Sequence, residues 1–262
     1  MRGLLRLFDH TKMIVLLSLT AGLYASLMIP FKGFVIIPGY TEIRPGSVIP
    51  VVCSLFFGPA AAWGAAFGNL IGDFVGMLGI GSLFGMFGNF IYGYIPYRVW
   101  LQAGPTAPVR LAGVRDVVRY VIAATAASMA CGVSIAWGLD LIGAVPFTFL
   151  ANVITINNVL VTLILGPALI KLLGPRVQAW GLLYQRIMGG TVRGSPAALH
   201  IVGMALIYAG GVMALAFANL GHFAGTHAID YSISATIFSH TFHLRAGTTP
   251  GMVLILLGCL LI

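Results

Sequence analysis

The 262-residue chain contains 59% hydrophobic and only 8% charged residues, and its mean hydropathy is +1.01. Several apolar stretches reach the roughly 20 residues that an α-helix needs to cross a bilayer. This composition excludes a water-soluble globular domain and predicts an all-α, polytopic membrane protein. The net charge of +8 comes from Lys and Arg residues that lie mostly between the apolar stretches, so it indicates membrane orientation and not nucleic-acid binding.

The predicted membrane helices, in chain order, are 12–30, 46–57, 60–77, 82–101, 116–139, 146–173 and 199–220. The first follows basic residues as in a signal peptide, but Leu23 stands where cleavage after Ala25 would need a small residue, so we interpret it as a retained helix. The last apolar run, 251–262, covers only about 18 Å at 1.5 Å per residue. It therefore ends within the bilayer, belongs to a longer protein, or continues the stretch 231–239.

Basic residues gather before the first helix, around the connection 102–114, and after residue 170. These three regions fall on one side of the membrane only if each of the first six helices crosses once, and an excess of Lys and Arg marks the cytoplasmic side. We therefore expect a multi-pass protein with a cytoplasmic N-terminus. We divide the chain into a six-helix membrane domain, 1–175, and a second part, 176–262, with an interfacial segment and a C-terminal transmembrane hairpin.

Two predicted helices combine ladders of small residues with a few polar side chains. The ladders have a spacing of four: Ala60, Gly64, Gly68, Gly72 and Gly76, then Gly81, Gly85 and Gly93. Small residues at this spacing let helices pack closely. Beside them lie Asn69 and Asp73 on one helix, and Asn89 and Tyr92 on the next. Polar groups in a membrane usually face a cavity or another helix, so these four predict a wall of a solute site, with helix-end capping as the alternative for Asp73.

The predicted helix 146–173 carries a polar stripe. At 100° per residue its members fall within about 120° of arc, whereas Asn157 points the other way. The members are Thr148, Asn152, Thr155, Asn158 and Thr162. Such a stripe either bonds a neighbouring helix or contacts a solute.

The segment 38–46 connects the first two predicted helices on the outer side. Pro and Gly at both of its ends argue against a helix. Glu42 and Arg44 are two apart, so in an extended segment their side chains would point to the same side. They either pair with each other or hold a solute while the loop closes over it.

Other features support fewer conclusions. The histidines His222, His227, His240 and His243, with Asp230 between them, could hold a transition metal, but their spacing matches no metal motif. The three cysteines are isolated and indicate neither a disulfide framework nor a metal site. The chain has no Gly-rich phosphate loop followed by Lys and Ser or Thr, so it cannot power transport with ATP by itself. We expect no enzymatic activity and no cofactor.

Several of these features together resemble the substrate-binding S components of energy-coupling factor (ECF) transporters. They are the six helices, the pair Ala21 and Ala25, and the stretch Leu-Phe-Phe-Gly-Pro-Ala-Ala-Ala at 55–62. The stretches 68–73 and 81–97 add to the likeness. Residues 42–45, Glu-Ile-Arg-Pro, resemble the branch of queuosine-precursor transporters. The resemblance covers residues 12–175.

The resemblance implies a subunit of the bacterial cytoplasmic membrane that captures a vitamin or other micronutrient. It would dock on a transmembrane T subunit driven by two ATPases, with Ala21 and Ala25 facing the T subunit. The solute would bind near the outer surface, beneath the connection between the first two helices. The residues implied there are Glu42, Arg44, Asn89 and Asn152. The part after 175 departs from the six-helix pattern.

We therefore expect a solute-capture subunit whose outer cavity binds a small polar compound. The residues expected to bind the solute are Glu42, Arg44, Asn69, Asp73, Asn89, Tyr92, Asn152, Thr155 and Asn158. One alternative is a secondary permease in which Asp73 couples transport to an ion gradient. Another is a metal-binding or enzymatic membrane protein that uses the histidines of 222–243.

Overall fold

The computed structural model of the protein describes residues 2–37, 41–42, 44–75, 78–104, 109–189, 194–226 and 233–262. Within these ranges, the side chains of 2–3, 35, 37, 41–42, 221–226 and 233–246 are outside the description.

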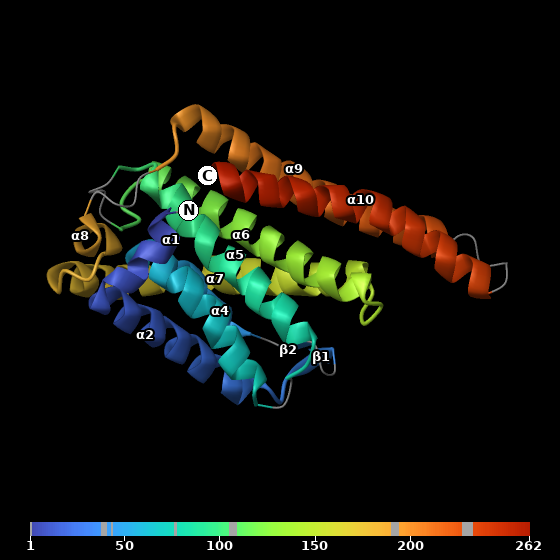
Figure 1. Ribbon diagram of the computed structural model, residues 1–262, viewed down its shortest axis with the longest axis horizontal. Coiled ribbons are helices and arrows are strands. Elements are labelled where there is room, and N and C mark those ends of the chain that lie inside the picture. The colour runs from blue at the N-terminus through green and yellow to red at the C-terminus, as the bar shows by residue number, and fades with distance from the viewer. Residues whose placement is uncertain are drawn as a thin grey trace.

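The chain forms a long helical bundle with one small two-stranded ribbon (Figure 1). Its main helices are α2 (Thr11–Met28), α3 (Val48–Phe57), α4 (Pro59–Asp73), α5 (Gly81–Leu101), α6 (Val114–Leu141), α7 (Phe147–Ala179), α9 (Ala197–Thr226) and α10 (Ile233–Leu261). Short elements are α1 (Arg2–Arg6), η1 (Leu7–Asp9), η2 (Ile29–Phe31), β1 (Val35–Ile37), β2 (Thr41–Glu42), η3 (Pro45–Ser47) and α8 (Tyr184–Ile187). The prediction of an all-α membrane protein is confirmed.

The two ends of the bundle differ in what they carry. Figure 1 shows both chain termini and α8 at one end, which we call the amino end, and β1 and β2 at the other, the ribbon end. Arg98 Nη2 donates to Ser195 Oγ at 2.8 Å, and Ser195 Oγ donates to the carbonyl of Ile262 at 2.7 Å, which ties three segments together at the amino end.

Within the described residues, four helical segments are long and apolar enough to cross a bilayer: Thr11–Phe31, Val114–Leu141, Phe147–Ile187 and Ala197–Leu220. The 10 residues of α3 and the 15 of α4 are shorter. At 1.5 Å per residue they reach only about 15 and 22 Å, against a hydrocarbon core of about 30 Å. The turn between them is built on Gly58, whose φ of 54° suits glycine, and Pro59 then starts α4 with a preset φ.

Several predicted boundaries differ from the structure. Helix α4 ends at Asp73, four residues before the predicted end, and α7 runs through Pro167 and Pro175 to Ala179, so the predicted interfacial segment begins inside a helix. The segment Pro45–Ser47 is a 3-10 turn, whereas Thr41–Glu42 is extended, as predicted. The run 251–262 belongs to the 29-residue α10 and so continues earlier residues.

The predicted close packing at small residues is present between α2, α4 and α5. A Cβ added to Gly64 would lie 2.6 Å from Cβ of Thr20, and one added to Gly93 would lie 2.8 Å from Cα of Ala62. Contacts this short leave no room for a side chain, so glycine sets the distance between these helices.

Helices α9 and α10 pair with each other and lie along one edge of the bundle, opposite α2 (Figure 1). A Cβ added to Gly251 would lie 2.6 Å from the carbonyl oxygen of Gly210, so this pair also packs backbone to backbone. The pair contacts α6 through polar groups: Thr125 Oγ1 and Tyr208 Oη lie 2.6 Å apart, and Trp137 Nε1 donates to Thr249 Oγ1 at 3.2 Å. The pair α9 and α10 is therefore packed against α6 and α7.

Candidate functional site: a polar network at the ribbon end

Side chains from three helices form a buried hydrogen-bond chain at the ribbon end. Tyr24 Oη of α2 donates to Asn89 Oδ1 of α5 at 2.8 Å. Asn89 Nδ2 donates to Asn69 Oδ1 of α4 at 3.0 Å, and Asn69 Nδ2 donates to Asp73 Oδ2 at 3.0 Å. We call Tyr24, Asn69, Asp73 and Asn89 the amide network. It brings together three of the residues predicted from the sequence.

Two cations from the connection between α2 and α3 complete the network. Lys32 Nζ lies 3.4 Å from Asp73 Oδ1, and Arg44 Nη1 donates to Asn69 Oδ1 at 3.0 Å. The exposed fractions of Asn69, Asn89 and Asp73 are 1%, 2% and 5%. A buried carboxylate is costly unless it is paired and hydrogen-bonded, so Lys32 and Asn69 together stabilise the charge of Asp73.

The network needs a glycine at position 85. The carbonyl of Gly85 accepts a second bond from Asn89 Nδ2 at 2.8 Å. A Cβ added there would lie 2.7 Å from Asn69 Nδ2. The small residues of α5 therefore provide room for the side chain of Asn69 at Gly85, and for the backbone of α4 at Gly93.

Helix α7 reaches the network through Asn157 and not through the predicted stripe. The backbone N–H of Arg44 donates to Asn157 Oδ1 at 3.5 Å. In the helical pattern of the sequence, Asn157 lies on the opposite side of the helix from the expected solute contacts. Arg44 is thus held on two sides, by α4 through its guanidinium and by α7 through its backbone.

The first part of the polar stripe binds α9. Asn152 Nδ2 donates to Asn219 Oδ1 at 2.9 Å, and Thr148 Oγ1 donates to the carbonyl of Ala218 at 3.2 Å. The sequence left two alternatives for the stripe, a neighbouring helix or a solute. Thr148 and Asn152 contact a neighbouring helix, α9. The structure does not bring Asn152 together with Asn89.

The rest of the stripe faces α5 and α6. Tyr92 Oη and Thr162 Oγ1 lie 2.6 Å apart, and both side chains are buried. Thr155 and Asn158 are also buried, and among the described residues Thr155 Oγ1 has no hydrogen-bond partner. A Cβ on Gly132 of α6 would collide with that hydroxyl, so α6 and α7 approach closely here. Tyr92 and Thr155 therefore lie at helix contacts.

Two groups of predicted residues are only partly described. Glu42 lies in β2, and its side chain is outside the described part of the chain. The same holds for the side chains of His222, His240 and His243, and for all of His227 and Asp230. Within the described residues, no group of three or more His, Cys, Asp or Glu is placed to hold a metal ion.

The predicted docking pair does not lie on an open face. Ala21 and Ala25 are 4% and 3% exposed and are buried in the contact between α2 and α4. The exposed face of α2 presents another small-residue series, Ser18, Gly22 and Ser26. A Cβ added to Gly22 would meet nothing within 4 Å.

Sequence reasoning did not find Lys32 or Tyr24. Lys32 is an isolated cation directly after an apolar helix, which could have marked it as a partner for a buried carboxylate. Tyr24 has no such signal, because a tyrosine among aliphatic residues of a membrane helix is also typical of plain packing.

The comparison with known families covers the part of the chain that contains the network. The model of the QueT transporter family matches residues 14–175, which include α3 to α6 and nearly all of α2 and α7. No curated protein and no solved structure matches the chain. The expected likeness to S components is confirmed, because this family is of the S-component-like type. The chain therefore belongs to the QueT transporter family.

Proposed function

We propose that the protein is the substrate-capture subunit of an ECF-type micronutrient transporter, with its solute site at the amide network. Membership of a transporter family already implies a membrane transport role for a small substrate. The observation that supports the location is the bond from Arg44 to Asn69, which joins the outer connection to a buried polar cluster.

The chemistry of the cluster suits a small polar compound with several hydrogen-bonding groups. Asn69 and Asn89 each offer both donors and acceptors, Asp73 offers acceptors, and the guanidinium of Arg44 offers a planar set of donors. These groups are already bonded to one another, so a solute would bind by replacing internal bonds. A polar heteroaromatic ring with ring nitrogens and an exocyclic amine or carbonyl matches this set.

The segment 29–47 is proposed to act as the cover of the site. It is held at one side by the ion pair of Lys32 with Asp73, and at the other by the bonds of Arg44 to Asn69 and Asn157. Pro45–Ser47, at the end of the segment, also packs against α2. Breaking the polar contacts would therefore loosen Lys32 and Arg44 from the helices while the helix seams beneath stay in place. A solute that replaces Arg44 at Asn69 would therefore couple its binding to the position of the cover.

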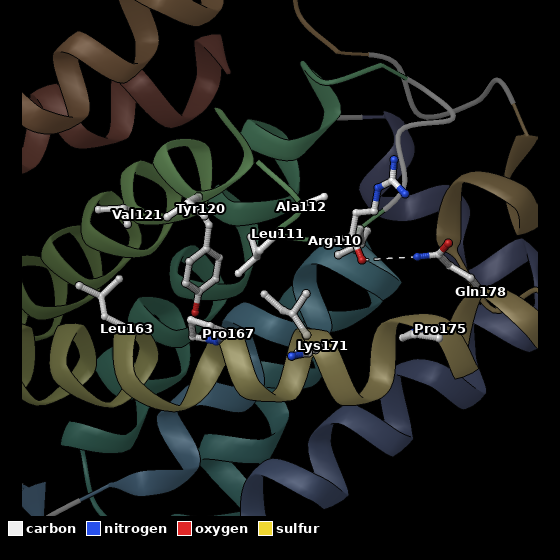
Figure 2. Close-up of a pocket in the computed structure, with 13 residues that line it drawn as sticks. Arg110, Leu111, Ala112, Tyr120, Val121, Leu163, Pro167, Lys171, Pro175 and Gln178 are labelled. Carbon is white, nitrogen blue, oxygen red and sulfur yellow. Dashed lines mark hydrogen bonds between the residues drawn. The ribbon is translucent and has the colours of Figure 1, made fainter. Parts of the chain in front are cut away.

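Orientation and energy supply complete the proposal. Basic residues gather toward the amino end: Arg98 bonds Ser195 beside Ile262, Figure 2 shows Arg110 and Lys171 near the last turns of α7, and Arg176 follows on the same helix before α8. This end is therefore proposed to be cytoplasmic, with the ribbon end outside. A T subunit with two ATPases would then supply the energy. The helix that docks on it would be α2, through Ser18, Gly22 and Ser26, because these small residues lie on its exposed face.

A secondary permease is the second candidate, favoured by the buried pair of Lys32 and Asp73. Protonation of Asp73 would remove the ion pair that anchors the cover, which is how an ion gradient could act on the same site. Liposomes that contain only this chain separate the two proposals. Gradient-driven uptake without ATPases would establish the permease, and uptake that requires the ATPases would establish the capture subunit.

The experiment that tests the location of the site begins with the small molecules that copurify with the chain, identified by mass spectrometry. Titration of that compound into the wild-type chain and into the Asn69→Leu and Asn89→Leu variants should show saturable binding only to the wild type. Unchanged affinity in both folded variants would refute the proposed site. Asn219→Leu, which removes an amide from α9 instead, is the matched control and should keep the affinity.

A further inference from the structure

A cavity of about 780 Å³ lies at the amino end, apart from the amide network (Figure 2). Its walls are the first turns of α6, the second half of α7 and the segment 109–112. No residue of the amide network lines it. It therefore needs an explanation of its own.

The lining changes from aliphatic to cationic along α7. Figure 2 shows Val121 and Leu163 at one side of the cavity and Arg110 and Gln178 at the other, with Lys171 between them on α7. Leu163 and Lys171 are eight residues apart, which corresponds to about 12 Å along a helix axis. Along the length of the bundle, the apolar part lies farther from the amino end, and the cationic part lies nearer to it.

The neutral polar groups of the cavity are already bonded. Tyr120 Oη donates to the carbonyl of Thr162 at 2.6 Å, and Gln178 Nε2 donates to the carbonyl of Val109 at 3.4 Å, the dashed line in Figure 2. The groups left for a ligand are therefore the charged ends of the two cations, Arg110 and Lys171.

No carboxylate balances these two cations within the described chain. Both side chains are exposed, and neither forms an ion pair with a described residue. The acid in the first turn of α6, Asp116, faces Arg119 at 3.7 Å instead. The cavity is thus complementary to an anion.

The apolar part of the cavity opens where acyl chains would lie. Val117 and Val121 are 43% and 38% exposed, and Ile164 and Leu172 on the outer side of α7 are also exposed. A free inorganic anion would use only the cationic part and leave this aliphatic surface unfilled. An amphiphile with an anionic head fills both.

We infer that this cavity binds an anionic phospholipid. Its phosphate would lie between Lys171 and Arg110, and an acyl chain would lie along Leu163, Val117 and Val121. Basic pockets between membrane helices on the cytoplasmic side bind the head groups of such lipids. This inference rests on the proposed cytoplasmic orientation of the amino end and not on the proposed solute site.

Photo-crosslinking with diazirine-labelled phosphatidylglycerol in bilayers that hold the full chain tests the inference. Labelling is expected in peptides that contain Val117–Val121 and Leu163–Lys171, and unlabelled phosphatidylglycerol should compete while phosphatidylcholine should not. One basic residue near an anionic membrane surface contributes about fivefold to affinity, so Lys171→Gln and Arg110→Gln should each weaken competition by about that factor. Both variants change exposed side chains, so both should fold.

The matched control is Arg176→Gln, which removes the same charge from the exposed side of the same helix, outside the cavity lining. It should keep the labelling. Equal losses in Arg176→Gln and Lys171→Gln would reduce the effect to general surface charge and overturn the inference. Equal competition by phosphatidylcholine, competition by inorganic phosphate, or labelling confined to α9 and α10 would also overturn it.

Discussion

Arg44 and Asn89 donate to the same oxygen atom, Oδ1 of Asn69, each at a distance of 3.0 Å. The acceptor belongs to α4, one donor to α5, and the other to the connection that covers the ribbon end. A single amide oxygen therefore links the connection between α2 and α3 to the packed helices.

Replacing Arg44 with Ala should weaken solute binding by about 10- to 100-fold, because the guanidinium displaced from Asn69 would itself bond the solute, and a hydrogen bond to a charged group contributes about 1.5–3 kcal/mol. The protein should remain folded, since the helix seams beneath the segment are unchanged. Arg115→Ala, which removes an exposed arginine at the amino end, is the control and should bind the solute normally. Calorimetric titration of both variants decides the point, and equal affinities would remove Arg44 from the site.

Replacing Lys32 with Met should lower the free energy of unfolding by about 3–5 kcal/mol, because it leaves a buried carboxylate without its cation. Only Asn69 would then bond Asp73 among the described residues. The double variant Lys32→Met with Asp73→Asn should recover most of the loss. Unfolding curves of the single and double variants in detergent measure this coupling, and additive losses would show that the two residues do not interact.

Gly85→Ala should reduce both stability and solute affinity, because the new methyl group would lie 2.7 Å from Asn69 Nδ2. Asn69 cannot move away without breaking its bonds to Asp73 and Asn89, at a cost of about 1 kcal/mol each. Gly22→Ala is the control in a helix with open space around the added methyl group. It should leave the stability unchanged or raise it by up to about 1 kcal/mol. A Gly85→Ala protein as stable as Gly22→Ala would contradict the described network.

Asn152→Leu and Asn157→Leu should have different effects, although both remove an amide from α7. Asn157 bonds Arg44, so its loss should weaken solute binding. Asn152 bonds Asn219, so its loss should leave the affinity within about twofold and lower stability by about 0.6 kcal/mol, the typical cost of such a bond between membrane helices. Solute affinity and the free energy of unfolding should be measured on both variants. A greater loss of affinity in Asn152→Leu than in Asn157→Leu would place the site nearer α9.

Gly22→Trp should prevent capture of the chain by a T subunit while solute binding persists, because the bulky ring would cover the small-residue face of α2. Val212→Trp places the same ring on an exposed position of α9 and serves as the control. Copurification with tagged T subunit and ATPases measures both variants. Loss of the complex in Val212→Trp alone would move the docking face to the C-terminal hairpin.

The sequence predicted the helical architecture and the core of the network for identifiable reasons. Asn69 and Asp73 are four apart, so a helix must place them on one side, and the adjacent glycines show where a second helix comes close. Asn89 occupies a gap in a ladder of glycines, which placed it at the same contact. These relationships are local to one helix or one helix pair.

Relationships that depend on helix rotation or on distant segments could not be predicted. Helix α2 carries two neighbouring series of small residues, one through Ala21 and one through Gly22, and a rotation of 100° exchanges the buried one for the exposed one. The stripe on α7 likewise does not reveal that Asn152 meets Asn219, 67 residues away. Tertiary packing, and not local pattern, decided both outcomes.

The docking of α9 and α10 limits how far the chain can be shortened. A fragment that stopped at residue 175 would lose Asn219, which bonds Asn152, and Thr249, which accepts from the indole N–H of Trp137. Asn152 Nδ2 would keep its bond to the carbonyl of Thr148, but hydrocarbon offers no new acceptor to the indole N–H. We therefore expect the part matched by the transporter family to be less stable alone than in the full chain. The loss would reach α7, the helix that also carries Asn157.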